Sequence, residues 1–143
     1  MNQFKKVPVW FYIVAVLAVV WNAMGIFAYL STVMMSTEDF AKMPQAMQDL
    51  QKATPLWAIA AFAIAVFAGT IGCLLLLIKK ALAFPVLVLS LIAVMVQMSN
   101  FIFLMEGFDV ISQEEMIMTL MVIIVAFLLM FFAKVSKAKG WIR

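Results

Sequence analysis

The sequence contains no histidine and a single cysteine, Cys73. Without histidine, the chain has no imidazole group to bind zinc or haem iron, or to transfer protons near neutral pH. One cysteine cannot form an intramolecular disulfide or a CxxC redox pair, and within an apolar segment it is expected to be a small packing residue. We therefore expect neither a metal site nor a cofactor.

Charged residues are also scarce. They make up 12% of the 143 residues, whereas 68% are hydrophobic and the mean hydropathy is +1.16. A soluble domain is roughly half apolar and about a quarter charged. A soluble fold of this length could not bury so much apolar surface, so the lipid bilayer must be the solvent of this chain. The net charge of +3 does not indicate nucleic-acid binding, because the basic residues flank the apolar segments.

Four apolar runs without charged residues cover residues 8–34, 55–78, 82–105 and 116–133. Each is close to or above the ~20 residues that a helix needs to cross ~30 Å of hydrocarbon. The first run follows two lysines, as in a signal peptide, but it is too long and lacks a clear cleavage site, so we interpret it as a mature helix. The sequence predicts one all-α domain over residues 1–143, an integral membrane four-helix bundle with up-down-up-down packing.

The basic residues predict the orientation of this bundle. Eight of the ten Lys and Arg residues, including Lys5, lie before the first run, between the second and third, or after the fourth. The other two connections hold two lysines and all seven acidic residues. Loops rich in Lys and Arg stay on the cytoplasmic side. Both termini are therefore predicted to be cytoplasmic.

The connection at residues 35–54 is long and is predicted to lie on the outer side. Its segment Ser36-Thr37-Glu38-Asp39 is typical of a helix start. Met43, Met47 and Leu50 then recur at helical spacing among polar residues. The pattern predicts one short amphipathic helix, or a pair broken at Pro44. It lies on the outer surface as an interfacial helix that caps the bundle, or as a lid over a pocket.

Prolines mark the expected helix starts. Pro8, Pro55 and Pro85 each lie near the beginning of an apolar run, where a missing N–H costs little. Thr54 precedes Pro55 and is predicted to be the N-cap of the second spanning helix.

Small residues recur at spacings of three and four in the first two runs. Helices in lipid associate through close backbone approach at such residues and through interhelical hydrogen bonds. The surface could pack within the chain or form a homodimer face, and the strong charge bias would make the subunits parallel. The residues predicted to pack helices together are Gly25, Ala61, Ala65, Ala68, Gly69 and Gly72.

Amide side chains occur deep in the first and third runs, where water is scarce and each amide needs a partner. They either clamp these two helices together or line a cavity, open to the outer face, for a neutral ligand that bears hydroxyl or amide groups. The residues predicted to bind such a ligand are Trp21, Asn22, Tyr29, Gln97 and Asn100.

Catalysis and ion-coupled transport are not expected. All the carboxylates of the chain lie in the connections, and no spanning run contains Asp or Glu. A nucleophile, metal ligand or acid–base group of the kind that membrane enzymes place near the interface is missing. We predict that the chain is not an enzyme.

Several motifs carry a resemblance to known sequences: Trp21-Asn22-x-x-Gly25, Thr54-Pro55-x-Trp57-Ala58, the run from Ala61 to Gly72, Gln97, and Lys137-Ala-Lys-Gly-Trp141. Through them most of the chain resembles a group of small, functionally uncharacterised four-helix bacterial membrane proteins that are loosely described as sugar transporters. The resemblance implies a bacterial inner-membrane protein that binds or facilitates the passage of a small neutral solute such as a sugar. The alternative is a structural or regulatory subunit that packs against a partner membrane protein.

Overall fold

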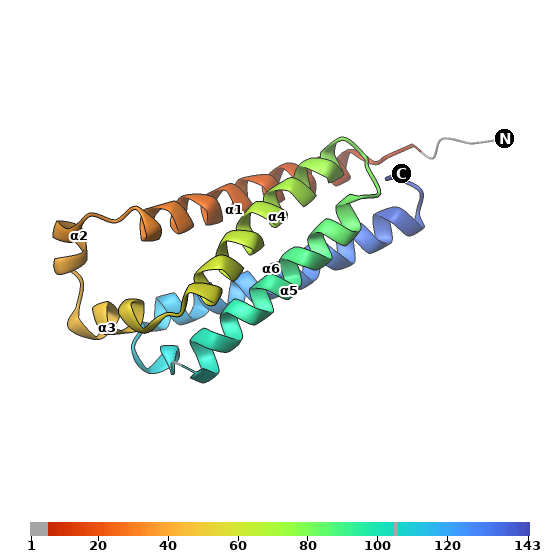
Figure 1. Cartoon of the computed structure of the whole chain (residues 1–143). Coiled ribbons are helices and arrows are strands. Elements are labelled where there is room, and N and C mark those ends of the chain that lie inside the picture. Colours follow the sequence, from red (N-terminus) through yellow and green to blue (C-terminus); the bar gives the residue numbers. More distant parts are fainter. Residues whose placement is uncertain (1–5, 105) are drawn as a thin grey trace.

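The computed structural model describes residues 6–104 and 106–143, and within them it contains helices and connecting segments but no strand. Consecutive long helices run in opposite directions, so that α1 begins and α6 ends at the same end of the molecule (Figure 1). This end is called the terminal end. The protein is an all-α membrane protein, as predicted, and its described residues contain four helical segments that are long and apolar enough to span a bilayer. They are α1 (Val9–Val33), α4 (Leu56–Leu77), α5 (Ala83–Ser99) together with the turn that follows it to Leu104, and α6 (Gln113–Ala138).

The segment predicted to form one amphipathic helix, or a pair broken at Pro44, lies at the opposite end, called the α2–α3 end (Figure 1). It contains α2 (Thr37–Ala41) and α3 (Gln45–Ala53), divided at Pro44. The Ser36 hydroxyl caps α2 by accepting a hydrogen bond from the Asp39 N–H at 3.1 Å. The helical character that the sequence predicts for this connection is thereby confirmed.

Helix α6 extends beyond both limits of the apolar run at 116–133. At its start the Ser112 hydroxyl accepts from the Glu115 N–H at 3.3 Å, while the Glu115 carboxylate accepts from the Ser112 N–H at 2.9 Å. This capping box extends the helix toward its N-terminus. Lys134 and Lys137 continue the helix at the other end, because long basic side chains can reach water from an apolar surface.

Two other predicted boundaries are corrected. Pro55, and not Thr54, is the N-cap of α4. The Thr54 hydroxyl instead donates to the Leu50 carbonyl at 2.9 Å, because Thr54 belongs to the end of α3. The run predicted over residues 82–105 continues past α5 as one π-helical turn, Asn100–Leu104. Its last residue, Met105, and the predicted cytoplasmic Lys5 lie outside the described residues.

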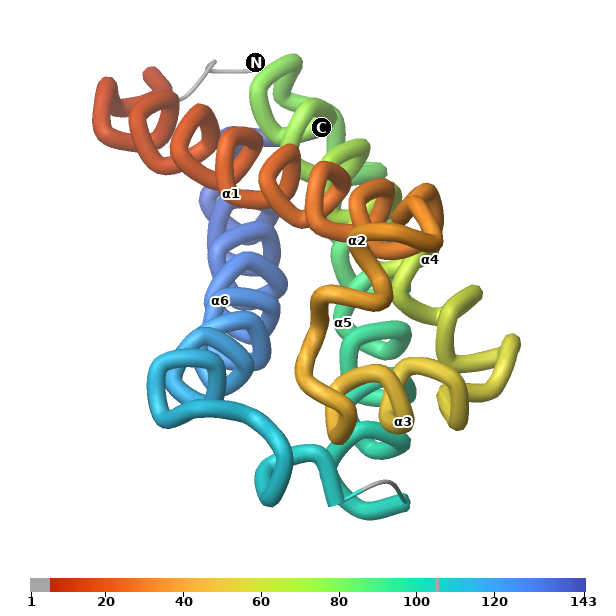
Figure 2. The backbone as a smooth tube through the Cα atoms, turned by 90° about the vertical axis from the view of Figure 1, so that its left-hand side faces the viewer, coloured from red at the N-terminus to blue at the C-terminus, as the bar shows by residue number. Residues whose placement is uncertain are grey.

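Helix α4 is the central helix of the bundle. It packs against α1 and α5, and α5 packs in turn against α6. Figure 2 shows α5 between α4 and α6. Glycines permit the close approach: a Cβ added at Gly72 would lie 2.6 Å from Leu87 Cγ, and one added at Gly25 would lie 3.0 Å from Val66 Cγ1. The buried residues of α4 are Ala58, Ala61, Ala65, Val66, Ala68, Gly69, Gly72, Cys73 and Leu76.

A dense apolar cluster, called the terminal core, fills the bundle toward the terminal end. The Phe11 and Phe132 rings, from α1 and α6, lie 5.4 Å apart by their centroids. The Trp141 ring also contacts Phe11, at 5.9 Å. The buried members of the terminal core are Phe11, Ala15, Ala18, Cys73, Leu76, Ala83, Leu87, Leu129, Ala133 and Ile142.

The C-terminal segment is fixed to the connection between α4 and α5. The Arg143 N–H donates to the Lys79 carbonyl at 2.9 Å, and the Ala81 N–H donates to the Arg143 carbonyl at 2.6 Å. Ile142, between these bonds and the bundle, is only 2% exposed. The terminal end is therefore closed by the last residues of the chain as well as by its helices.

Candidate functional site

A cavity of about 350 Å³ lies among all four spanning helices. Its volume is within the ~300–1,000 Å³ typical of small-molecule pockets. Most of its lining is apolar, and its polar side chains come from all the spanning helices except α4: Asn22 from α1, Ser90 and Gln97 from α5, and Thr119 from α6. Of the residues that the structure describes, none that lines it is charged. It is called the central cavity.

Asn22 is held against α4. Its amide nitrogen donates to the Ala18 carbonyl at 2.9 Å and to the Cys73 sulfur at 3.5 Å. Its amide oxygen lies so close to Gly69 that any side chain there would overlap with it. Asn22 thus joins α1 to α4 at the wall of the central cavity.

The direct amide clamp between α1 and α5 is not formed, so that interpretation of Asn22 and Gln97 is wrong. The Asn22 amide bonds to Ala18 and Cys73, and no hydrogen bond joins it to Gln97 in the part of the chain that the structure describes. The physical reason is the position of α4, which packs against both α1 and α5. Similar depth in the membrane therefore does not bring the two amides together.

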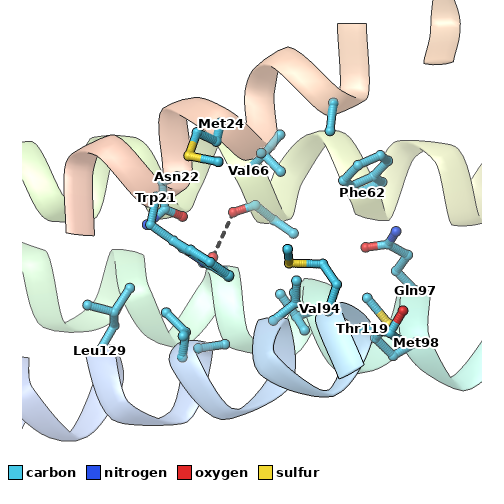
Figure 3. A pocket seen from close by; sticks show the side chains of 18 of the residues that line it. Trp21, Asn22, Met24, Phe62, Val66, Val94, Gln97, Met98, Thr119 and Leu129 are labelled. Carbon is cyan, nitrogen blue, oxygen red and sulfur yellow. Dashed lines mark hydrogen bonds between the residues drawn. The ribbon is translucent and has the colours of Figure 1, made fainter. Parts of the chain in front are cut away.

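Ser90 supplies a link between α5 and α4. Its hydroxyl donates to the Ala65 carbonyl at 2.7 Å, the bond drawn in Figure 3, and its side chain is buried. Ser90 was not among the residues predicted to form a site. Its spacing of seven residues from Gln97, two helical turns, could have indicated that the two side chains share a helix face.

Gln97 projects into the part of the central cavity nearest the α2–α3 end, close to Phe62, Met98 and Thr119 (Figure 3). The Thr119 hydroxyl already donates to the Glu115 carbonyl in its own helix, at 2.8 Å. Across the described residues, the Gln97 amide makes no hydrogen bond of its own. Gln97 therefore offers both donor and acceptor capacity to a molecule in the cavity.

A second, smaller cavity of about 240 Å³ lies beside the first, toward the α2–α3 end. Phe62 and Gln97 line both cavities. This smaller cavity is called the vestibule, and its polar lining residues are Thr32, Gln51, Thr54, Gln97 and Asn100.

The five predicted ligand-binding residues are thus divided. Trp21, Asn22 and Gln97 line the central cavity, whereas Asn100 lines the vestibule and is 4% exposed. Tyr29 lines neither: its ring packs edge-on against Phe62 and Phe67, with centroids 5.4 and 6.1 Å away.

Thr32 and Gln51 were not predicted, because they lie at the end of α1 and in the outer loop, where polar residues are ordinary. Only the fold places them beside the amides of α5.

No known protein family, curated protein or solved structure matches this chain.

Proposed function

We propose that this protein binds a small neutral molecule within the membrane. The observation that carries the proposal is the central cavity, where the Gln97 amide has no hydrogen-bond partner among the described residues and faces a largely apolar lining. A charged ligand would find no opposite charge in that lining, and burying an unpaired charge is costly. A molecule with apolar surface and one or a few hydrogen-bonding groups suits these walls best.

Binding fits the geometry better than passage of a sugar does. A sugar carries a hydroxyl on most of its carbons, and the few polar side chains of the central cavity could not satisfy them all. The terminal core also fills the bundle between the cavity and the terminal end. Both features favour a binder over the facilitator that the sequence also suggested.

The proposed orientation in the membrane follows from the positions of the charged residues. Lys79 and Lys80 lie at the terminal end with the basic C-terminal segment, whereas Glu38, Asp39 and Asp49 lie at the α2–α3 end. The positive-inside rule then makes the terminal end cytoplasmic. The resemblance noted above favours a bacterial inner membrane.

The alternative is a subunit that packs against another membrane protein, or a parallel homo-oligomer, through its small residues. Ala65, Ala68, Gly69 and Gly72 are however buried within the single chain. Their close-approach surface is thus already occupied by α1 and α5. This makes the alternative the weaker proposal.

A fluorescence titration tests the proposed binding. The full chain in phosphatidylcholine vesicles is titrated with undecanol that carries bromine at the end of its chain, because bromine quenches tryptophan on contact. The quenching specific to Trp21 is the difference between the wild type and Trp21→Phe. We expect it to saturate at low probe-to-lipid ratios.

Two phenylalanine substitutions on α6 provide the matched pair. Val122 lines the cavity, so Val122→Phe fills it and should abolish the saturable part of the Trp21 quenching. Ile124→Phe faces outward, where Ile124 is 55% exposed, and should leave it unchanged. Quenching that rises linearly with the probe-to-lipid ratio and is equal in both variants would contradict the proposal.

A further inference from the structure

The vestibule lies beside the central cavity, and a larger share of its lining residues is polar. Thr32 of α1, Gln51 of α3 and Asn100 of the turn after α5 line the vestibule. Trp21, Asn22 and Leu129 line the opposite end of the central cavity, where the Asn22 amide nitrogen is already bonded to Ala18 and Cys73 (Figure 3). Gln97 and Phe62 lie between the two parts, since they line both.

From this arrangement we infer that the ligand is a neutral amphiphile, with its apolar chain in the central cavity and a hydroxyl- or amide-bearing head in the vestibule. The inference rests on the proposed function and adds the ligand class and the direction in which the ligand lies. Gln97 is its head-group contact: its amide can donate to, and accept from, the first polar atom of the head.

The charge around the site favours a neutral head. Within residues 6–104 and 106–143, no Asp, Glu, Lys or Arg lines the vestibule or the central cavity. A shallow hollow beside the vestibule is lined by Asn100 and Asp49. The Asp49 carboxylate would repel an anionic head at that point. A cationic head would have this one carboxylate outside the vestibule and no counter-charge within it. Uncharged hydroxyl or amide groups match the side chains that are present.

The proposed ligand has a route from the α2–α3 end. The terminal core fills the bundle beyond Leu87 and Leu129, which both line the central cavity. The rim of the vestibule includes Thr32 and Val33, and Val33 is 45% exposed. An amphiphile that enters chain first from the α2–α3 end passes between Gln97 and Phe62 and comes to rest with its chain end near Trp21.

Three brominated probes in phosphatidylcholine vesicles test this inference: undecanol with bromine at the chain end, undecanol with bromine beside the carbinol carbon, and undecane with terminal bromine. We expect the chain-end bromine to quench Trp21 strongly and the head-side bromine weakly. The alcohol should bind more tightly than the alkane by roughly three- to tenfold, the effect of one neutral hydrogen bond.

Gln97→Leu should lower the affinity for the alcohol to that for the alkane, and leave the alkane unaffected. Thr70→Val is the matched control. It removes a hydroxyl that is bonded within its own helix and that lines neither cavity, so both affinities should be unchanged. Thermal unfolding in detergent verifies that each variant is folded.

The outcomes separate this inference from the proposed function. Equal affinities for alcohol and alkane, both insensitive to Gln97→Leu, would overturn the inference while leaving binding in the cavity intact. Stronger quenching by the head-side bromine would overturn it through the orientation. If no probe gives saturable quenching that depends on Trp21, the inference and the proposed function fail together.

Discussion

At the scale of single residues, Gly69 on α4 is the point where three helices meet. The Asn22 amide of α1 lies against it, and a Cβ added at Gly69 would be 3.1 Å from the Ser90 hydroxyl of α5. Both polar groups are held in place by their own hydrogen bonds to Ala18, Cys73 and Ala65. The missing side chain therefore provides the space in which α1 and α5 reach α4.

Gly69→Ala should destabilise the protein, because the added methyl group displaces the Asn22 amide from its two bonds. Overpacking of this kind costs about 1–3 kcal/mol. Thermal unfolding in detergent measures the effect. In an Asn22→Ala background the same change should cost clearly less, because the overlap is removed. An equal cost in both backgrounds would mean that the amide does not occupy this space.

Asn22→Leu and Gln97→Leu should change the free energy of unfolding additively. Asn22→Leu should destabilise, since it removes the bond to Cys73, whereas Gln97→Leu should have little effect, because the Gln97 amide has no partner among the described residues. Residues that do not share a contact usually add within about 0.3–0.5 kcal/mol. A larger deviation from additivity in the free energy of unfolding would support the amide clamp that the sequence suggested.

The sequence predicted which polar residues lie deep in the membrane but not which atoms they contact. Depth follows from position along an apolar run, and it correctly placed Asn22 and Gln97 within the spanning helices. Contact depends on how the helices are arranged around α4, and no pattern within one run encodes that. The contacts of Asn22 on α4 are the Cys73 sulfur and Gly69, and the sequence analysis assigned both residues to packing alone.

At the scale of helices, α6 shows how local hydrogen bonds set the limits of an element. Ser112→Ala removes one half of the capping box, and losing an N-cap costs about 1 kcal/mol. We expect faster amide hydrogen exchange in the first turn of α6, with the middle of the helix unchanged. Ser99→Ala is the control, because the Ser99 hydroxyl bonds only to the Met95 carbonyl of its own helix. Equal exchange in wild type and Ser112→Ala would show that the cap is dispensable.

The presence of the helices was predictable from the sequence, whereas their first and last residues were only partly predictable. The apolar runs give the length that lipid must cover, and this was sufficient to find all four spanning helices. The cap at Ser36 and the break at Pro44 were also recognisable from residue chemistry. The assignment of Thr54 failed because a threonine between two helices can serve either one, and its hydroxyl turned back to Leu50.

At the scale of the whole molecule, the orientation in the membrane gives the most direct prediction. In a Cys73→Ser background, a cysteine at exposed Gln45 in α3 should react with an impermeant maleimide in intact cells. A cysteine at exposed Ala138, at the end of α6, should react only after permeabilisation. Ser136 would be a poor labelling site, because it is fully buried. The reverse labelling pattern would contradict cytoplasmic termini.

The bundle follows from the sequence more completely than the site does. Apolar length and small residues were sufficient for four packed helices, since lipid leaves the backbone few alternatives to a helix. The central cavity is a volume that the side chains leave unfilled, and it depends on the angle and distance between helices. The vestibule depends in addition on where α3 lies, which is a property of a polar connection.

The covered terminal end has a consequence for which ligand concentration would determine the occupancy of the cavity. Ile142 is buried and Arg143 is bonded to Lys79 and Ala81, so the C-terminal segment covers the terminal end. For the binder that we propose, occupancy would then follow the chemical activity of the ligand at the α2–α3 end and in the surrounding lipid. The output of such a binder would be the fraction of molecules that are occupied, rather than a net flux.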